Sequence, residues 1–228
     1  MGRLDGKIAF VTAAGGAIAG ATARLFGAEG AAVACGTGTA YGALRRMHTA
    51  GGSTLAVFGQ GPVGLSATVL GRAMGTRVIA VETGAERLAL AEEHGADATI
   101  DASKEDPVEV LKELTRGEGV DLALDCTGAP AARLAAVRGA RTWGTVCFVG
   151  EGNDVTLDVS RDLIRKQLTI IGSWTFSAVG QAECARFVAD NKIPLERIFT
   201  HRYNLDEAAQ AYQLFDTQTT GKGVFLFD

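Results

Sequence analysis

The sequence predicts an α/β fold in which helices cover both faces of a doubly wound parallel sheet. From residue 54 onward, short β-rich runs alternate with longer amphipathic ones, as strands and crossover helices do. The chain also has 30 glycines and only 4 prolines, so it has many flexible turns and few residues that break the elements between them. One such sheet with a small additional segment accounts for the length of the chain.

Six runs have the length and composition of strands. They are residues 54–58, 77–82, 98–100, 120–125, 145–150 and 168–174. Apolar residues recur at helical spacing in several intervals between them, over residues 62–74, 85–95, 107–117 and 131–140. A helix at 206–216 and a strand at 224–227 are expected to close the fold.

The composition limits the classes of partner. The net charge of -4 and the scattered basic residues argue against binding to nucleic acid or to an anionic membrane surface. No apolar run approaches the ~18 residues of a spanning helix, and the amino terminus lacks a secretion signal. We therefore expect a cytoplasmic protein with small-molecule ligands. The four cysteines show no paired spacing, which favours reduced thiols.

The strongest local motif is GQGPVG, residues 59–64, which follows an apolar strand and opens a helix. Gly59 permits the tight turn, Gly61 lets the backbone approach a pyrophosphate, and Gly64 allows the helix to pack closely on the strand. The helix begins at Pro62, and its N-terminal N–H groups would bind the phosphates. This context predicts a Rossmann fold that binds a dinucleotide. A generic strand–turn–helix junction is the alternative.

Glu82 ends the strand that follows this helix, about 20 residues after the motif. A carboxylate at that position accepts hydrogen bonds from the adenosine ribose and repels the 2′-phosphate of NADP. No basic cluster stands beside it to compensate, so NAD is the predicted cofactor. The alternative is a solvated carboxylate at a strand end. Arg87 is equally compatible with a position against the adenine and with a solvated position on a helix.

With these motifs in place, the chain resembles the medium-chain, zinc-dependent alcohol and polyol dehydrogenases over residues 35–227. CGTGTAYGAL at 35–44 looks like the helix that leads from the catalytic domain of that family into its cofactor domain. HGADATID at 94–101 and GKGVFLF at 221–227 match later landmarks of the family in their order and spacing. The resemblance implies a Rossmann NAD-binding domain over residues 35–228.

The resemblance also implies a set of cofactor-binding residues. Thr39 and Val63 would contact the nicotinamide, and Lys222 the pyrophosphate. Cys126 and Thr127 would lie on the adenosine side. The residues that follow the last strands of the sheet would line the nicotinamide pocket, namely Val149, Gly150, Glu151, Ser173 and Thr175. Ordinary packing at a strand end is the alternative for each of them.

Cys35 stands where those family members that use a cysteine have a ligand of the catalytic zinc. Such a zinc needs three protein ligands and an open position. In the family the other two come from an amino-terminal domain for which this sequence has no counterpart. His48, His94 and His201 do not have the spacing of a zinc motif. Zinc is therefore not expected in this chain alone.

Residues 1–34 resemble instead the opening strand, helix and second strand of a short-chain dehydrogenase. Ala13, Ala17 and Ala19 occupy the positions of the three signature glycines, and each adds a Cβ where close approach is needed. No tyrosine is followed four residues later by the lysine that this second family uses in catalysis. We expect a structural β-α-β cap, fused to a foreign cofactor domain by natural recombination or by construction.

Two functions remain open at this point. The first is the NAD(H)-binding part of an alcohol or polyol oxidoreductase, inactive alone unless another chain supplies the catalytic part. The second, favoured for the isolated chain, is a cofactor-binding module without chemistry, such as a nucleotide sensor or an engineered scaffold. A homodimer is expected in either case, because the apolar run 168–174 would lie near the edge of the sheet and could pair with a second copy.

Overall fold

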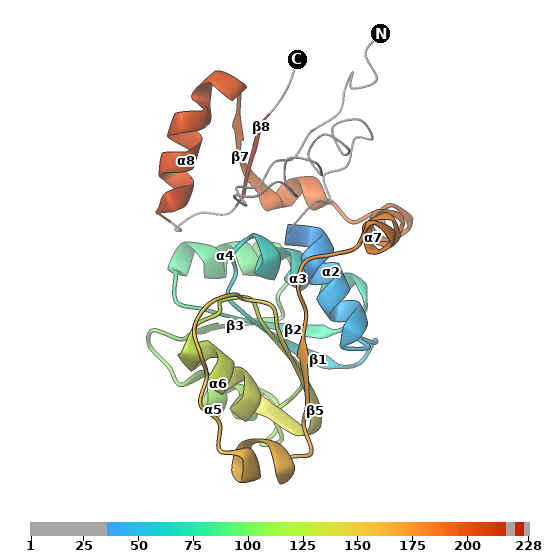
Figure 1. Ribbon diagram of the computed structural model, residues 1–228, viewed down its shortest axis with the longest axis vertical. Coiled ribbons are helices and arrows are strands. Elements are labelled where there is room, and N and C mark those ends of the chain that lie inside the picture. Colours follow the sequence, from blue (N-terminus) through green and yellow to red (C-terminus); the bar gives the residue numbers. More distant parts are fainter. Residues whose placement is uncertain (1–35, 218–221, 226–228) are drawn as a thin grey trace.

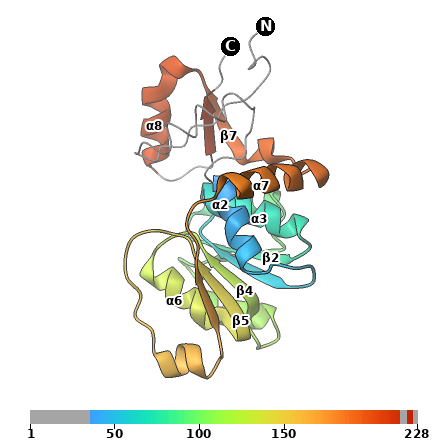
Figure 2. The same ribbon diagram turned by 45° about the vertical axis from the view of Figure 1, so that its right-hand side comes forward.

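The computed structural model of the protein describes residues 36–217 and 222–225 (Figures 1 and 2). The cap expected at residues 1–34 and the zinc ligand expected at Cys35 lie outside the described residues. No helix in the described part is both long enough and apolar enough to cross a membrane.

The predicted doubly wound sheet is confirmed. Six parallel strands pair in the order β3-β2-β1-β4-β5-β6. The strands are β1 (Thr54–Phe58), β2 (Arg77–Glu82), β3 (Ala98–Asp101), β4 (Val120–Asp125), β5 (Ala140–Phe148) and β6 (Thr169–Gly172). The strand order reverses between β1 and β4, and ligands of doubly wound sheets bind at the carboxyl ends of the strands at such a point.

Helices cover both faces of the sheet, as crossover connections between parallel strands require. One face carries α2 (Gly36–Arg46), α3 (Pro62–Ala73), α4 (Ala85–Glu93) and α7 (Ala178–Asp190), and the other carries α5 (Pro107–Leu114) and α6 (Pro130–Gly139). Alternate residues of β1 point to the two faces. Leu55 and Val57 pack into one core, and Ala56 and Phe58 into the other. Because both faces are buried, the strand is an uninterrupted apolar run.

The end of the chain forms a separate unit beside the sheet, which we call the C-terminal unit (Figures 1 and 2). Its strands β7 (Phe199–Tyr203) and β8 (Lys222–Phe225) pair in parallel, and α8 (Ala208–Asp216) lies between them in sequence. The strand expected at 224–227 corresponds to β8, which begins at Lys222; residues 226 and 227 lie outside the described residues. The sequence did not predict β7, because its Thr, His and Arg interrupt the apolar pattern.

Several strand boundaries differ from the sequence prediction, among them those of β5 and β6. β5 begins at Ala140 instead of residue 145, and its pairing with β4 shifts register between Val120 and Leu122. β6 ends at Gly172 instead of residue 174. Soon after, Thr175 has φ +50°, a left-handed conformation through which a strand cannot continue.

Candidate functional site

The glycine motif forms a tight turn between β1 and α3, and its three glycines are required for different reasons. Gly59 has φ +85°, and its N–H donates to the carbonyl of Val81 at 2.8 Å. A Cβ on Gly64 would overlap the Gly59 carbonyl, so the turn and the helix approach as closely as their backbones allow. A Cβ on Gly61 would meet nothing within 4 Å. This open space beside Gly61 could accept a pyrophosphate.

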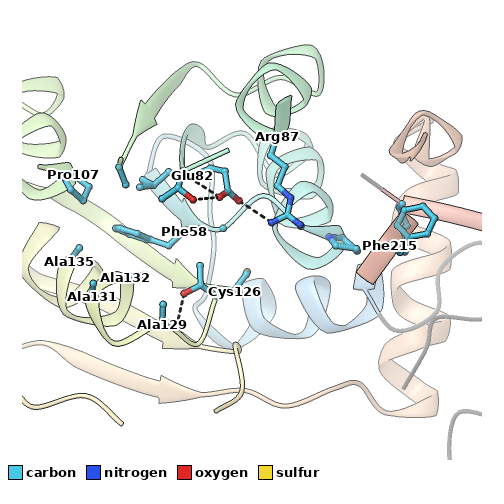
Figure 3. Close-up of a pocket in the computed structure, with 18 of the residues that line it drawn as sticks. Phe58, Glu82, Arg87, Pro107, Cys126, Ala129, Ala131, Ala132, Ala135 and Phe215 are labelled. Atoms are coloured by element: carbon cyan, nitrogen blue, oxygen red, sulfur yellow. Dashed lines mark hydrogen bonds and ion pairs between the residues drawn. The ribbon is translucent and has the colours of Figure 1, made fainter. Parts of the chain in front are cut away.

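A cavity of about 950 Å³ opens beside this turn (Figure 3). It lies at the carboxyl ends of β1, β2 and β4, where the strand order reverses. Residues of the C-terminal unit, among them Tyr203 and Phe215, form another wall. The cavity brings together eight residues that the sequence predicted: Gly59, Gly61, Pro62, Glu82, Arg87, Cys126, Thr127 and Lys222.

The carboxylate of Glu82 is held by hydrogen-bond donors at the wall of this cavity. Its Oε2 accepts from the Gln60 N–H at 2.8 Å, and its Oε1 accepts from the Thr83 N–H at 2.7 Å. Burial acts to raise the pKa of this carboxyl, but the backbone donors and the charge of Arg87 outweigh it, and the pKa is lowered. Glu82 is therefore an oriented anion at neutral pH and not a solvated strand end.

Arg87 lies against Glu82 and is not a solvated helix residue. Its Nη1 is 3.6 Å from Oε2 of Glu82, and only 20% of its side chain is exposed. The guanidinium group lies at the wall of the cavity (Figure 3). The solvated helix position is therefore excluded, and the position against an adenine stays a prediction.

Gln60 is a residue of the site that the sequence analysis did not identify. Its side chain is fully buried beneath the turn. The amide Nε2 donates to the Val57 carbonyl at 3.0 Å, and Oε1 accepts from Oγ1 of Thr68 at 3.0 Å. The amide therefore ties the end of β1 to α3 across the turn. The signal in the sequence was a long polar residue between two glycines directly after an apolar strand.

Asp125 is a second residue that the sequence analysis missed. It ends β4, is fully buried, and accepts from the N–H and the hydroxyl of Thr127 at 2.9 and 2.6 Å. Its Oδ2 lies 3.4 Å from Nε of Arg133, whose Nη2 donates to the Gly150 carbonyl at 2.6 Å. Through these contacts, Asp125 and Arg133 connect the loop after β4 to the loop after β5. A carboxylate at the end of a buried strand was the available signal.

Lys222, which is buried, and Cys126, which is half-buried, lie at two other parts of the cavity. Lys222 begins β8, is 2% exposed, and has its Nζ 5.6 Å from the ring centroid of Phe199. A Cβ on Gly36 would lie 3.1 Å from this Nζ and 3.2 Å from the Pro62 carbonyl oxygen, so the ammonium group lies close to the start of α3. Burial raises the pKa of the Cys126 thiol well above 9.0, which keeps the thiol protonated.

The other predicted residues do not line this cavity. They are Thr39, Val63, Gly64, Val149, Gly150, Glu151, Ser173 and Thr175. Thr39 is buried in α2, Ser173 is buried after β6, and Glu151 is exposed. The nicotinamide pocket expected from these residues stays a prediction.

Potential metal ligands are dispersed in the described part of the chain. Among residues 36–217 and 222–225, no group of three or more His, Cys, Asp or Glu side chains could hold a metal ion. The Nδ1 atom of His94 lies 2.7 Å from the Leu90 carbonyl oxygen at the end of α4, and His201 stacks on Tyr203 in the C-terminal unit.

Comparison with known proteins gives a match to the zinc-binding dehydrogenase family over residues 62–190. The chain is 39% identical over 201 residues to an uncharacterized zinc-type alcohol dehydrogenase-like protein of Escherichia coli (strain K12). This alignment covers 87% of this chain and 57% of the relative. It is 32% identical to L-threonine 3-dehydrogenase of Bacillus subtilis (strain 168), and that alignment covers 83% of this chain and 55% of the relative.

Solved structures agree with this match. An alcohol dehydrogenase zinc-binding domain protein from Burkholderia ambifaria superimposes with a TM-score of 0.78 and 31% identity, covering 90% of this chain and 56% of that one. An alcohol dehydrogenase from Thermotoga maritima gives a TM-score of 0.77 and 29% identity, covering 84% and 55%. The chain thus spans little more than half the length of these relatives.

Proposed function

This chain belongs to the zinc-binding dehydrogenase family, and we propose on that premise that residues 35–228 form a domain that binds NAD(H). The observation that supports this proposal most directly is that Gly61 and Glu82 line the same cavity. Gly61 leaves space for phosphates at the start of α3, and Glu82 offers an oriented carboxylate to a ribose. These two features are the ones that a dinucleotide requires.

The other residues of the cavity fit the same ligand. The pyrophosphate would lie against the glycine turn and the N-terminus of α3, with the Lys222 ammonium group nearby to balance its charge. The adenosine would lie between Arg87 on one side and Cys126 and Thr127 on the other. The nicotinamide would extend toward the residues that follow β5 and β6.

NAD(H) is the proposed cofactor in preference to NADP(H). A 2′-phosphate would stand beside the Glu82 carboxylate, which is ionised and cannot rotate freely because both of its oxygens accept hydrogen bonds. Arg87 is already paired with this carboxylate. The negative 2′-phosphate would therefore be repelled by the Glu82 carboxylate, and Arg87 could not compensate because it already pairs with Glu82.

We propose that the domain is the cofactor half of an enzyme that oxidises an alcohol or a polyol. Bound NAD would accept the hydride. The residues that activate the hydroxyl group would come from outside the described ones, and the domain alone would bind the cofactor without turnover. The family match and the relative named L-threonine 3-dehydrogenase support this substrate class.

We further propose that two copies associate through β6. This strand lies at the edge of the sheet, and Ile170 in it is 37% exposed. Ile164, just before it, is 64% exposed, and Trp143 of the neighbouring strand is 69% exposed. An exposed strand edge with apolar side chains around it favours pairing with a second copy.

Titration of the purified chain with NADH, followed by the fluorescence of the dihydronicotinamide, tests the proposed cofactor site. We expect saturable binding at one site per chain that ADP-ribose displaces, because the cavity holds the adenosine and pyrophosphate contacts. Absence of saturable binding, or binding that ADP-ribose leaves unchanged, would overturn the proposal.

A further inference from the structure

We propose that the buried amide of Gln60 is a positioning residue for cofactor selection, because with Thr68 it holds the glycine turn so that the Gln60 N–H fixes the Glu82 carboxylate. The inference rests on the proposed binding of NAD(H). It assigns a role to a side chain that cannot contact the cofactor.

The Gln60 side chain connects three parts of the structure. It is fully buried, and so is Thr68 in the second turn of α3. Both ends of the amide are used, since Nε2 donates to the Val57 carbonyl in β1 and Oε1 accepts the Thr68 hydroxyl, each at 3.0 Å. A buried amide with both of its ends paired holds one orientation, because turning it would leave polar groups without partners.

This fixed side chain determines where the Gln60 peptide points. The backbone N–H of the same residue donates to Oε2 of Glu82 at 2.8 Å. The neighbouring Gly59 is held to β2 by its own N–H, which donates to the Val81 carbonyl at 2.8 Å. The turn therefore has one anchor in β1, one in α3 and two at the end of β2, and the carboxylate that would select the cofactor is part of this unit.

Loss of the Gln60 amide would act on selectivity through Glu82. Without its side-chain anchors the turn can relax, and the Gln60 N–H no longer holds Oε2 in place. The carboxylate could then turn away from the ribose hydroxyls, which weakens NADH binding, and away from a 2′-phosphate, which reduces repulsion of NADPH. A purely structural role predicts a loss of stability with no change in selectivity.

The experiment measures dissociation constants of NADH and NADPH by calorimetry for the full chain and three variants. Gln60→Met keeps the volume of the side chain and removes the amide, whereas Thr68→Val keeps its shape and removes the hydroxyl. Thr76→Val is the matched control, because Thr76 is equally buried and its hydroxyl donates to the Gly71 carbonyl at 2.9 Å, away from the turn. Thermal unfolding of each variant gives its stability.

We expect Gln60→Met to weaken NADH binding about tenfold. The dissociation constant of NADPH divided by that of NADH should become smaller than in the wild type. Thr68→Val should act in the same direction with a smaller effect, and it serves as the test if Gln60→Met does not fold. Thr76→Val should lower only the unfolding temperature. An unchanged ratio in Gln60→Met and Thr68→Val would overturn the inference while the proposed function stands. A wild-type chain that binds neither cofactor would overturn both.

Discussion

The backbone N–H of Gln60 and the Oε2 atom of Glu82 are 2.8 Å apart, which joins the glycine turn after β1 to the carboxylate that ends β2. The sequence places these groups 22 positions apart, and the parallel pairing of β1 with β2 brings them together. Ionisation of Glu82 therefore stabilises the position of the glycine turn as well as the end of β2.

Replacing Glu82 should change stability in a way that depends on pH. Although burial opposes it, the donors around the carboxyl lower its pKa below 4.5 in the folded protein. The charged form therefore stabilises the folded state above that pH, and this contribution is lost as the pH falls through the lowered pKa. We expect Glu82→Gln to be less stable than the wild type at neutral pH in urea unfolding, and the difference to shrink in acid. A difference that stays constant across this range would contradict the account.

Gly61→Val should remove cofactor binding without harming the fold. Gly61 has φ -71° and ψ -170°, a conformation open to any residue, and its Cβ would meet no protein atom within 4 Å. The added side chain would occupy the space proposed for the pyrophosphate. We expect NADH affinity to fall at least about a hundredfold, with the free energy of unfolding changed by less than about 0.5 kcal/mol.

Gly64→Val is the contrasting variant. A Cβ there would overlap the Gly59 carbonyl, so this change should destabilise the protein itself. If Gly61→Val bound NADH as the wild type does, or if the two variants lost stability equally, the assignment of the turn would be incorrect.

Removing Asp125 should be costly because its partner would stay buried. Arg133 is 11% exposed, and Asp125→Ala would leave its guanidinium without the carboxylate. We expect a loss of about 3–5 kcal/mol in the free energy of unfolding, measured by urea denaturation, and a smaller loss for Asp125→Asn, which can still accept from Thr127. Equal and small losses in both variants would show that the ion pair does not stabilise these loops.

Much of the fold could be predicted from the sequence, because a parallel sheet buried on both faces leaves strong local signals. The strands Thr54–Phe58 and Arg77–Glu82 each contain a continuous apolar run, and the helices between the strands have an apolar face. The helix Ala178–Asp190 was missed, although Ser177 is its N-cap and accepts from the Gly180 N–H. Its apolar residues follow no clear helical stripe, so its position depends on contacts with α2.

The candidate site divides in the same way. The sequence could indicate the glycines and Glu82 as candidate residues. The glycines act within one turn, and Glu82 is separated from them only by the helix that connects β1 to β2. Gln60 and Asp125 could not be identified, because their roles depend on Thr68 and Arg133, and a sequence does not show which buried polar groups pair. The cofactor contacts of all the predicted residues stay predictions.

The β6 edge predicts the oligomeric state. We expect the wild-type chain to sediment as a dimer at micromolar concentration, and Ile170→Lys to sediment as a monomer, because the lysine would place a charge in the paired edge. Leu205→Lys is the control, since Leu205 is 62% exposed in the C-terminal unit, away from β6. A wild-type monomer, or a dimer unaffected by Ile170→Lys, would contradict the proposed interface.

Glu82 is the residue that would make this cavity a site for NAD(H). Calorimetric titration of the wild-type chain with NADH and with NADPH under the same conditions tests this role most directly. We expect NADH to bind at least about tenfold more tightly than NADPH, a difference of about 1.4 kcal/mol. Equal or tighter binding of NADPH, or no binding of either cofactor, would contradict it.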